Sequence, residues 1–142
     1  MKGFEVDEAK KAFSDKGFLL FDSGIKADIL DGVLDILEPH WQEKKAPPGV
    51  LNQQLQEENL KLGRNRLQDL WEVIPEVKSI ALHEQILTLL EELFSARPKP
   101  FQTLNFPVGT EQAVHSDSVH FNSVPFGLMC GVWVALEDVQ HE

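Results

Sequence analysis

Apolar residues recur at helical spacing in three stretches of the first hundred residues. Residues 7–16 place two alanines and a phenylalanine on one face, and Gly17 follows as a stop signal. Residues 25–37 repeat leucine, isoleucine and valine at intervals of three and four, and Pro39 is expected to end that helix. Residues 75–97 have a long apolar face between an opening and a closing proline. The first part of the chain therefore predicts packed helices.

A different pattern marks the last third of the chain. Residues 101–106 alternate in polarity, 107–110 form a turn, and 112–119 can be extended. Residues 128–136 are an apolar run typical of a β-strand, and a shorter run at 18–21 suggests one more strand. Helices followed by antiparallel strands predict an α+β fold.

Residues 41–66 are the least regular stretch. An Ala-Pro-Pro-Gly sequence at 46–49 interrupts regular structure, and the residues after it are polar and rich in glutamine and glutamate. Such a stretch is either a mobile loop over a site or a solvated connection, and we expect the connection. We therefore expect one domain, with a mainly helical lead-in (1–99) that includes the loop, and the first strands at 100–142.

The charge balance argues against polyanionic partners. The chain has 13 Lys and Arg against 23 Asp and Glu, a net charge of −10, so no basic stripe can displace counterions from phosphates. We expect neither nucleic acid nor a membrane as a partner, since no apolar run is long enough to span a bilayer. Lys61, Arg64 and Arg66 are a local exception that suits one small anion. The single Cys130 excludes a disulfide framework and favours a reducing, cytoplasmic location.

His115 and Asp117 are the strongest candidates for chemistry. Residues two apart in a strand point to the same face, so an imidazole and a carboxylate can reach one point. This donor pair suits Fe(II) held by two histidines and one carboxylate, with open positions for a chelating cosubstrate and dioxygen. The triplet alone is weak, because chance produces a His-x-Asp here with a probability of about 0.3. Asp117 can instead cap a polar turn.

Several separate blocks resemble the phytanoyl-CoA dioxygenase family. They occur in the family's order at residues 66–71 (RLQDLW), 100–109 (PFQTLNFPVG), 115–123 (HSDSVHFNS) and 129–139 (MCGVWVALEDV). The resemblance is dense over residues 64–142. The family consists of non-haem Fe(II)- and 2-oxoglutarate-dependent oxygenases on a double-stranded β-helix, a cupin-like jelly roll, so the resemblance implies this fold for the strands.

The resemblance also implies roles for particular residues. His115 and Asp117 match two iron ligands, and Arg66 matches the basic residue of a Lys/Arg-x-Gln-Asp motif that reaches the cosubstrate. Leu104 and Trp133 match positions that line the 2-oxoglutarate site. The implied reaction converts 2-oxoglutarate to succinate and CO2 while a C–H bond of a small organic substrate is hydroxylated. A carboxylate ligand favours hydroxylation over the halogenation of related enzymes.

Elementary chemistry agrees with these roles. A guanidinium at Arg66 suits the dianion 2-oxoglutarate, and Leu104 and Trp133 would form dry walls around the iron. The alternative to these roles is that Arg66 is simply solvated and that Leu104 and Trp133 pack in the core. We expect His120 and Asn122 to line the substrate pocket.

The resemblance is incomplete at the C-terminal end. The family's second histidine ligand and its 2-oxoglutarate-binding arginine would lie beyond residue 142, and His141 is too close to Trp133 to serve. A jelly roll has about eight strands, of which we find about three or four. We therefore expect an N-terminal, inactive portion of an oxygenase that self-associates through exposed strand edges. The alternatives are a non-catalytic interaction module or pseudoenzyme, and a cupin-like metalloenzyme that does not use 2-oxoglutarate.

Overall fold

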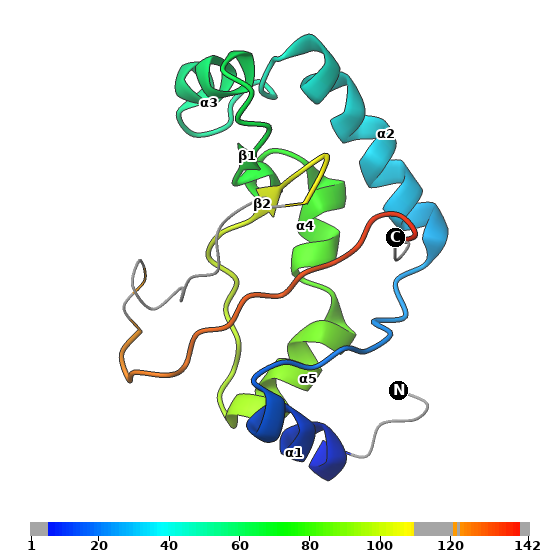
Figure 1. Ribbon diagram of the computed structural model, residues 1–142, viewed down its shortest axis with the longest axis vertical. Coiled ribbons are helices and arrows are strands. Elements are labelled where there is room, and N and C mark those ends of the chain that lie inside the picture. The colour runs from blue at the N-terminus through cyan, green and yellow to red at the C-terminus, as the bar shows by residue number, and fades with distance from the viewer. Residues whose placement is uncertain (1–5, 110–120, 122, 140–142) are drawn as a thin grey trace.

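The computed structural model describes residues 6–109, 121 and 123–139, and helices dominate them (Figure 1). None of the described helices is long and apolar enough to cross a membrane. The helix-first order predicted from the sequence is confirmed. In chain order the elements are α1 (Val6–Lys16), α2 (Ala27–Glu43), α3 (Gln53–Lys61), β1 (Leu67–Gln68), the 3-10 helix η1 (Leu70–Glu72), α4 (Pro75–Ala81), α5 (Glu84–Phe94) and β2 (Leu104–Asn105).

The main core lies between α2, α3, β1, η1 and α4. α2 contributes Val33, Leu37 and Trp41, which are spaced by four and therefore share one face of the helix. Leu60 of α3 and Leu67 of β1 are fully buried in the same cluster. Burying each such leucine contributes about 1.5–3 kcal/mol, so this core fixes β1 against the helices.

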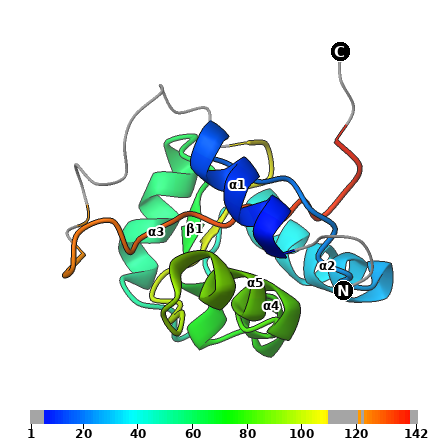
Figure 2. The ribbon, with the colours of Figure 1, turned by 90° about the horizontal axis from the view of Figure 1, so that it is seen from below.

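A second contact joins α1 to α5, and both ribbon views show the two helices side by side (Figure 1 and Figure 2). Ala9 of α1 and Leu89 of α5 are buried there, and the rings of Phe13 and Phe94 meet edge to face with centroids 5.7 Å apart. Gly17 ends α1 with a φ of 76°, and its N–H donates to the carbonyl of Phe13 at 2.8 Å. This confirms the predicted helix and its stop.

Two predictions for the first half are wrong. α2 continues through Pro39 to Glu43, because Trp41 in the next turn is buried in the core and its burial offsets the hydrogen bond that proline removes. The run at 18–21 is not a strand. Phe18 and Leu20 are exposed, and no strand pairs with this run within the described residues.

The predicted loop at 41–66 contains α3. Its Gln56 and Leu60 are both buried, and they are four residues apart on the face that covers the core. The stretch is polar because the other faces of a short helix point to water. Tertiary burial of one face, rather than helix propensity, therefore explains this element.

The predicted helical region at 75–97 is two helices, α4 and α5. Pro75 opens α4 as predicted, and His83 interrupts the helix with an extended backbone before α5 begins. The break lets the two helices serve different contacts, since Val77 of α4 is in the main core whereas α5 packs on α1.

Of the strands predicted for residues 100–142, only the one that contains β2 is confirmed. Of residues 101–106, only Leu104–Asn105 pair in a ladder, and residues 128–136 form no strand. A strand needs a neighbour for its backbone groups, and none pairs with 128–136 in the part of the chain that is described. The predicted strand at 112–119 lies entirely outside the described residues. The mixed helix and strand content is shown, whereas a jelly roll is not.

Candidate functional site

The ladder of β1 and β2 brings together the segments that carry Arg66 and Leu104. Leu67 pairs with Asn105, and Gln68 pairs with Leu104, in antiparallel register. Paired residues point to the same side, and the side alternates along each strand. Because Leu67 is fully buried, Gln68 and Leu104 lie on the face away from the core. Arg66 precedes β1 by one residue and is exposed, and it falls on that outer face if the alternation continues beyond the paired residues.

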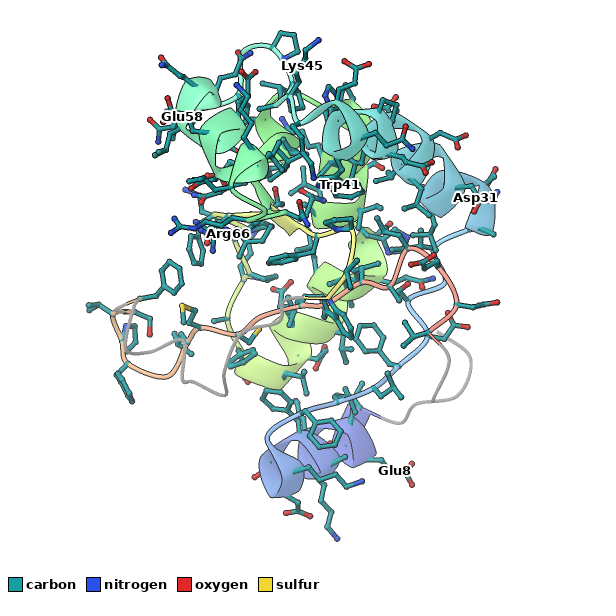
Figure 3. All side chains as sticks on the ribbon, turned by 45° about the horizontal axis from the view of Figure 1, so that its top comes forward. Glu8, Asp31, Trp41, Lys45, Glu58 and Arg66 are labelled. Carbon is teal, nitrogen blue, oxygen red and sulfur yellow. The ribbon has the colours of Figure 1, made fainter. Side chains whose placement is uncertain are left out.

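This outer face is accessible. Arg66 is exposed and forms no ion pair within the described residues, and Leu104 is 39% exposed. Figure 3 shows Arg66 at the edge of the molecule beside the ladder, whereas Trp41 lies among the helices. In the described part of the chain, an exposed guanidinium and an exposed apolar side chain at one short ladder suit a small carboxylate with a hydrocarbon stem.

A second cation, Lys44, contacts the residue that precedes Arg66 in the sequence. Lys44, at the end of α2, donates from Nζ to Oδ1 of Asn65 at 3.0 Å, which places an ammonium beside the residue before Arg66. Arg64 instead donates to Oδ1 of Asn59 at 3.2 Å. Lys44 therefore lies beside the segment that carries the predicted basic cluster of Lys61, Arg64 and Arg66.

Asp69 closes the ladder where β1 ends. Its φ is 57°, and its carbonyl accepts the N–H of Glu72 at 3.2 Å instead of a group on β2. Its N–H donates to the carbonyl of Thr103 at 2.8 Å, and its Oδ1 accepts the N–H of Thr103 at 3.2 Å. The carboxylate thus replaces a backbone carbonyl, while its Oδ2 accepts from Nε2 of Gln68 at 3.0 Å. Asp69 consequently holds β2 in register with β1.

Gln56 of α3 closes the opposite edge of β1, and its side chain is buried. Its Oε1 accepts the N–H of Gln68 at 2.8 Å, and its Nε2 donates to the carbonyls of Gln68 at 3.1 Å and Leu51 at 2.8 Å. Backbone groups alternate between the two edges of an antiparallel strand. Because the backbone N–H of Asp69 bonds to β2, the backbone N–H and C=O of Gln68 point to the other edge of β1. At that edge the Gln56 amide takes the place of a neighbouring strand.

Sequence reasoning missed the importance of both residues. Asp69 stands in the RLQDLW block, where only the arginine was assigned a role. Gln56 carried a signal, because it precedes Leu60 by four residues and so puts a polar group on the buried face of α3. A buried amide needs partners, and the strand edge supplies them.

Trp133 is 72% exposed, so it encloses no cavity in the described structure. The dry walls expected from Leu104 and Trp133 are not found among the described residues, because no neighbouring strand covers the segment at 128–136. The cosubstrate role of Trp133 stays a prediction.

The predicted metal and substrate ligands are not part of the described structure. His115, Asp117, His120 and Asn122 all lie outside the described residues. In the described ranges, no group of three or more His, Cys, Asp or Glu side chains is arranged to hold a metal ion. The roles of these four residues stay predictions.

Cys130 is half-buried, and this burial raises the pKa of its thiol. The neutral form is favoured, because a thiolate would lose solvation there. The thiol is therefore a weak nucleophile and a weak metal ligand at neutral pH.

Comparison with known proteins gives one match. The model of a family described as Phytanoyl-CoA dioxygenase (PhyH) matches residues 13–142. No match was found among curated proteins or among solved structures. The matched range contains the ladder, Gln56, Asp69 and every predicted site residue.

Proposed function

The chain belongs to the phytanoyl-CoA dioxygenase family, and from this premise we propose that it is an Fe(II)- and 2-oxoglutarate-dependent oxygenase acting on a small organic substrate. The observation that carries the proposal is the outer face of the β1–β2 ladder. Arg66, one residue before β1, and Leu104 of β2 are the two residues that the resemblance assigns to the cosubstrate site, and both are exposed at this ladder.

His115 and Asp117 are proposed as two of the iron ligands. Their imidazole nitrogen and carboxylate oxygen are the donors that a facial triad uses, and the triad takes one further histidine. When bound, the iron would supply the oxidation chemistry, in which one atom of dioxygen enters succinate as 2-oxoglutarate loses CO2 and the other enters the hydroxyl group formed from a substrate C–H bond.

The protein's own residues would bind and orient the cosubstrate. Arg66 would pair with a carboxylate of 2-oxoglutarate, and Leu104 would contact its methylene carbons. We also propose that Trp133 forms a wall of this site. His120 and Asn122 would contact the substrate through hydrogen bonds.

Substitution of Arg66 tests the proposal. We expect Arg66→Ala to weaken 2-oxoglutarate binding about 10- to 100-fold, because a bond between two charged groups is lost. The affinity of Arg66→Lys should lie between those of the wild type and Arg66→Ala, because lysine keeps the positive charge but cannot form a bidentate pair with a carboxylate. Affinity is measured by calorimetry on the full-length protein as its gene encodes it, in the presence of Fe(II) and without oxygen.

Arg64→Ala is the matched control. Its guanidinium bonds to Asn59, so its removal should leave the affinity within about twofold of the wild type. Wild-type affinity in Arg66→Ala would contradict the proposal, as would an equal loss in both alanine variants.

A second candidate is a non-catalytic interaction module. It is favoured by the exposed apolar side chains of Val124, Phe126 and Trp133, since such side chains grouped along one segment mark binding surfaces. This candidate predicts partner binding without affinity for 2-oxoglutarate, so the same calorimetry separates the two.

A further inference from the structure

Both edges of β1 are closed although the strand has only two residues. One edge pairs with β2, and the other is occupied by the amide of Gln56, which is 8% exposed. A strand this short has few backbone bonds of its own. The bonds to Gln56 are therefore a large share of what fixes the backbone at Gln68.

The residues held by this amide belong to the accessible face. Gln68 points to the same side of the ladder as Arg66, two residues earlier, and it is the cross-strand partner of Leu104. Displacement of the backbone at Gln68 would therefore move both the cationic and the apolar contact of that face.

We propose that Gln56 is a positioning residue for this face: its amide acts as a surrogate strand that sets where Arg66 and Leu104 are presented to an anionic ligand. The identity of that ligand as 2-oxoglutarate rests on the proposed function. The two bonds to Gln68 need a donor and an acceptor on one side chain, which a primary amide provides.

The wild-type protein gives the first test. The N–H of Gln68 points away from β2, and in the described part of the chain its hydrogen-bond acceptor is Oε1 of Gln56. We expect slow hydrogen exchange at this amide in the full chain, measured by NMR or by mass spectrometry with fragmentation. Exchange as fast as in an unstructured peptide would overturn the proposal without the need for any variant.

Two substitutions separate positioning from simple packing. Gln56→Leu fills the space but removes the hydrogen bonds, whereas Gln56→Glu keeps an acceptor for the Gln68 N–H and loses the donor. We expect exchange at Gln68 to rise about tenfold or more in Gln56→Leu and less in Gln56→Glu. Gln54→Leu is the control, because this exposed residue of α3 bonds only to Glu58 in the described structure.

Binding of 2-oxoglutarate, with Fe(II) and without oxygen, is the second measurement. We expect about a 5- to 10-fold weaker affinity in Gln56→Leu, an intermediate value in Gln56→Glu and no change in Gln54→Leu. If Gln56→Leu speeds exchange at the Gln68 amide but leaves the 2-oxoglutarate affinity unchanged, the positioning role is overturned. Gln56 would then only stabilise the fold.

The two proposals fail in different ways. If the wild type does not bind 2-oxoglutarate, the proposed function fails together with this ligand, while the exchange data still decide whether Gln56 closes the strand. If Gln56→Leu does not fold, Gln56→Glu and the wild-type exchange measurement decide the outcome. If Gln54→Leu weakens binding as much as Gln56→Leu, the proposal is wrong.

Discussion

Single side chains complete the short ladder by replacing backbone groups. Asp69 supplies a carboxylate oxygen where the backbone of β1 turns away, and Gln56 supplies an amide where no neighbouring strand is paired in the described part. Both residues are polar and buried. Local sequence patterns assign such residues to solvent, because a pattern does not record which backbone groups are left without partners.

The role of Asp69 predicts a graded loss of stability. Asp69→Ala removes the bonds to Thr103 and Gln68 and puts a less tolerant residue at a positive φ. We expect a loss of about 2–4 kcal/mol in the free energy of unfolding. Asn at this position keeps an acceptor and tolerates the positive φ, so we expect Asp69→Asn to lower the free energy of unfolding by about 1 kcal/mol or less. Urea unfolding measures both, and equal losses would contradict the assigned role.

The raised pKa of Cys130 predicts slow alkylation. At pH 8 a smaller fraction of Cys130 is thiolate than in a free cysteine, and the alkylation rate should go on rising with pH beyond the range in which a free thiol levels off. Mass spectrometry of the iodoacetamide adduct follows the reaction, with urea-unfolded protein as the control. Equal rates for folded and unfolded protein at pH 8 would disagree with burial.

Among the elements, α3 shows most clearly what a sequence pattern omits. α1 was predictable because its face and its glycine stop are local signals. α3 was not, because its burial depends on distant partners, and α2 passed Pro39 for the same reason. Residues 128–136 have a strand-like pattern, yet a strand exists only where another strand pairs with it.

The two faces of α3 predict opposite results for the same substitution. Leu60 is fully buried, whereas Leu55 on the same helix is 56% exposed. We expect Leu60→Ala to lower the free energy of unfolding by about 2–5 kcal/mol, because a cavity forms in the core. Leu55→Ala should cost less than about 0.5 kcal/mol. Chemical denaturation measures both, and similar losses would show that α3 does not pack as described.

The whole molecule combines a well-packed helical part with exposed apolar side chains at 124–133. Helical order, the mixed fold class and the family were all within reach of the sequence. The face shared by Arg66 and Leu104 was not, because it follows from a register between residues far apart in the chain. The roles of Trp133 and of the ligands beyond residue 109 stay predictions.

The exposed apolar segment predicts self-association. We expect residues 1–142 to sediment as species larger than a monomer, because grouped apolar side chains associate in water. Phe126→Ser should shift the distribution toward monomer, whereas Leu62→Ser, at another exposed leucine, should not. A wild type that is monomeric at all tested concentrations would contradict this expectation.

The measurement that tests the central claim most directly is an anaerobic titration with Fe(II) and 2-oxoglutarate. It uses the full-length protein as its gene encodes it. We predict a metal-to-ligand charge-transfer absorption that His115→Ala and Asp117→Ala abolish and that Ser116→Ala, between them, retains. No such absorption in the wild type, or an undiminished one in the His115 and Asp117 variants, would contradict the assignment of this chain as an iron- and 2-oxoglutarate-dependent oxygenase.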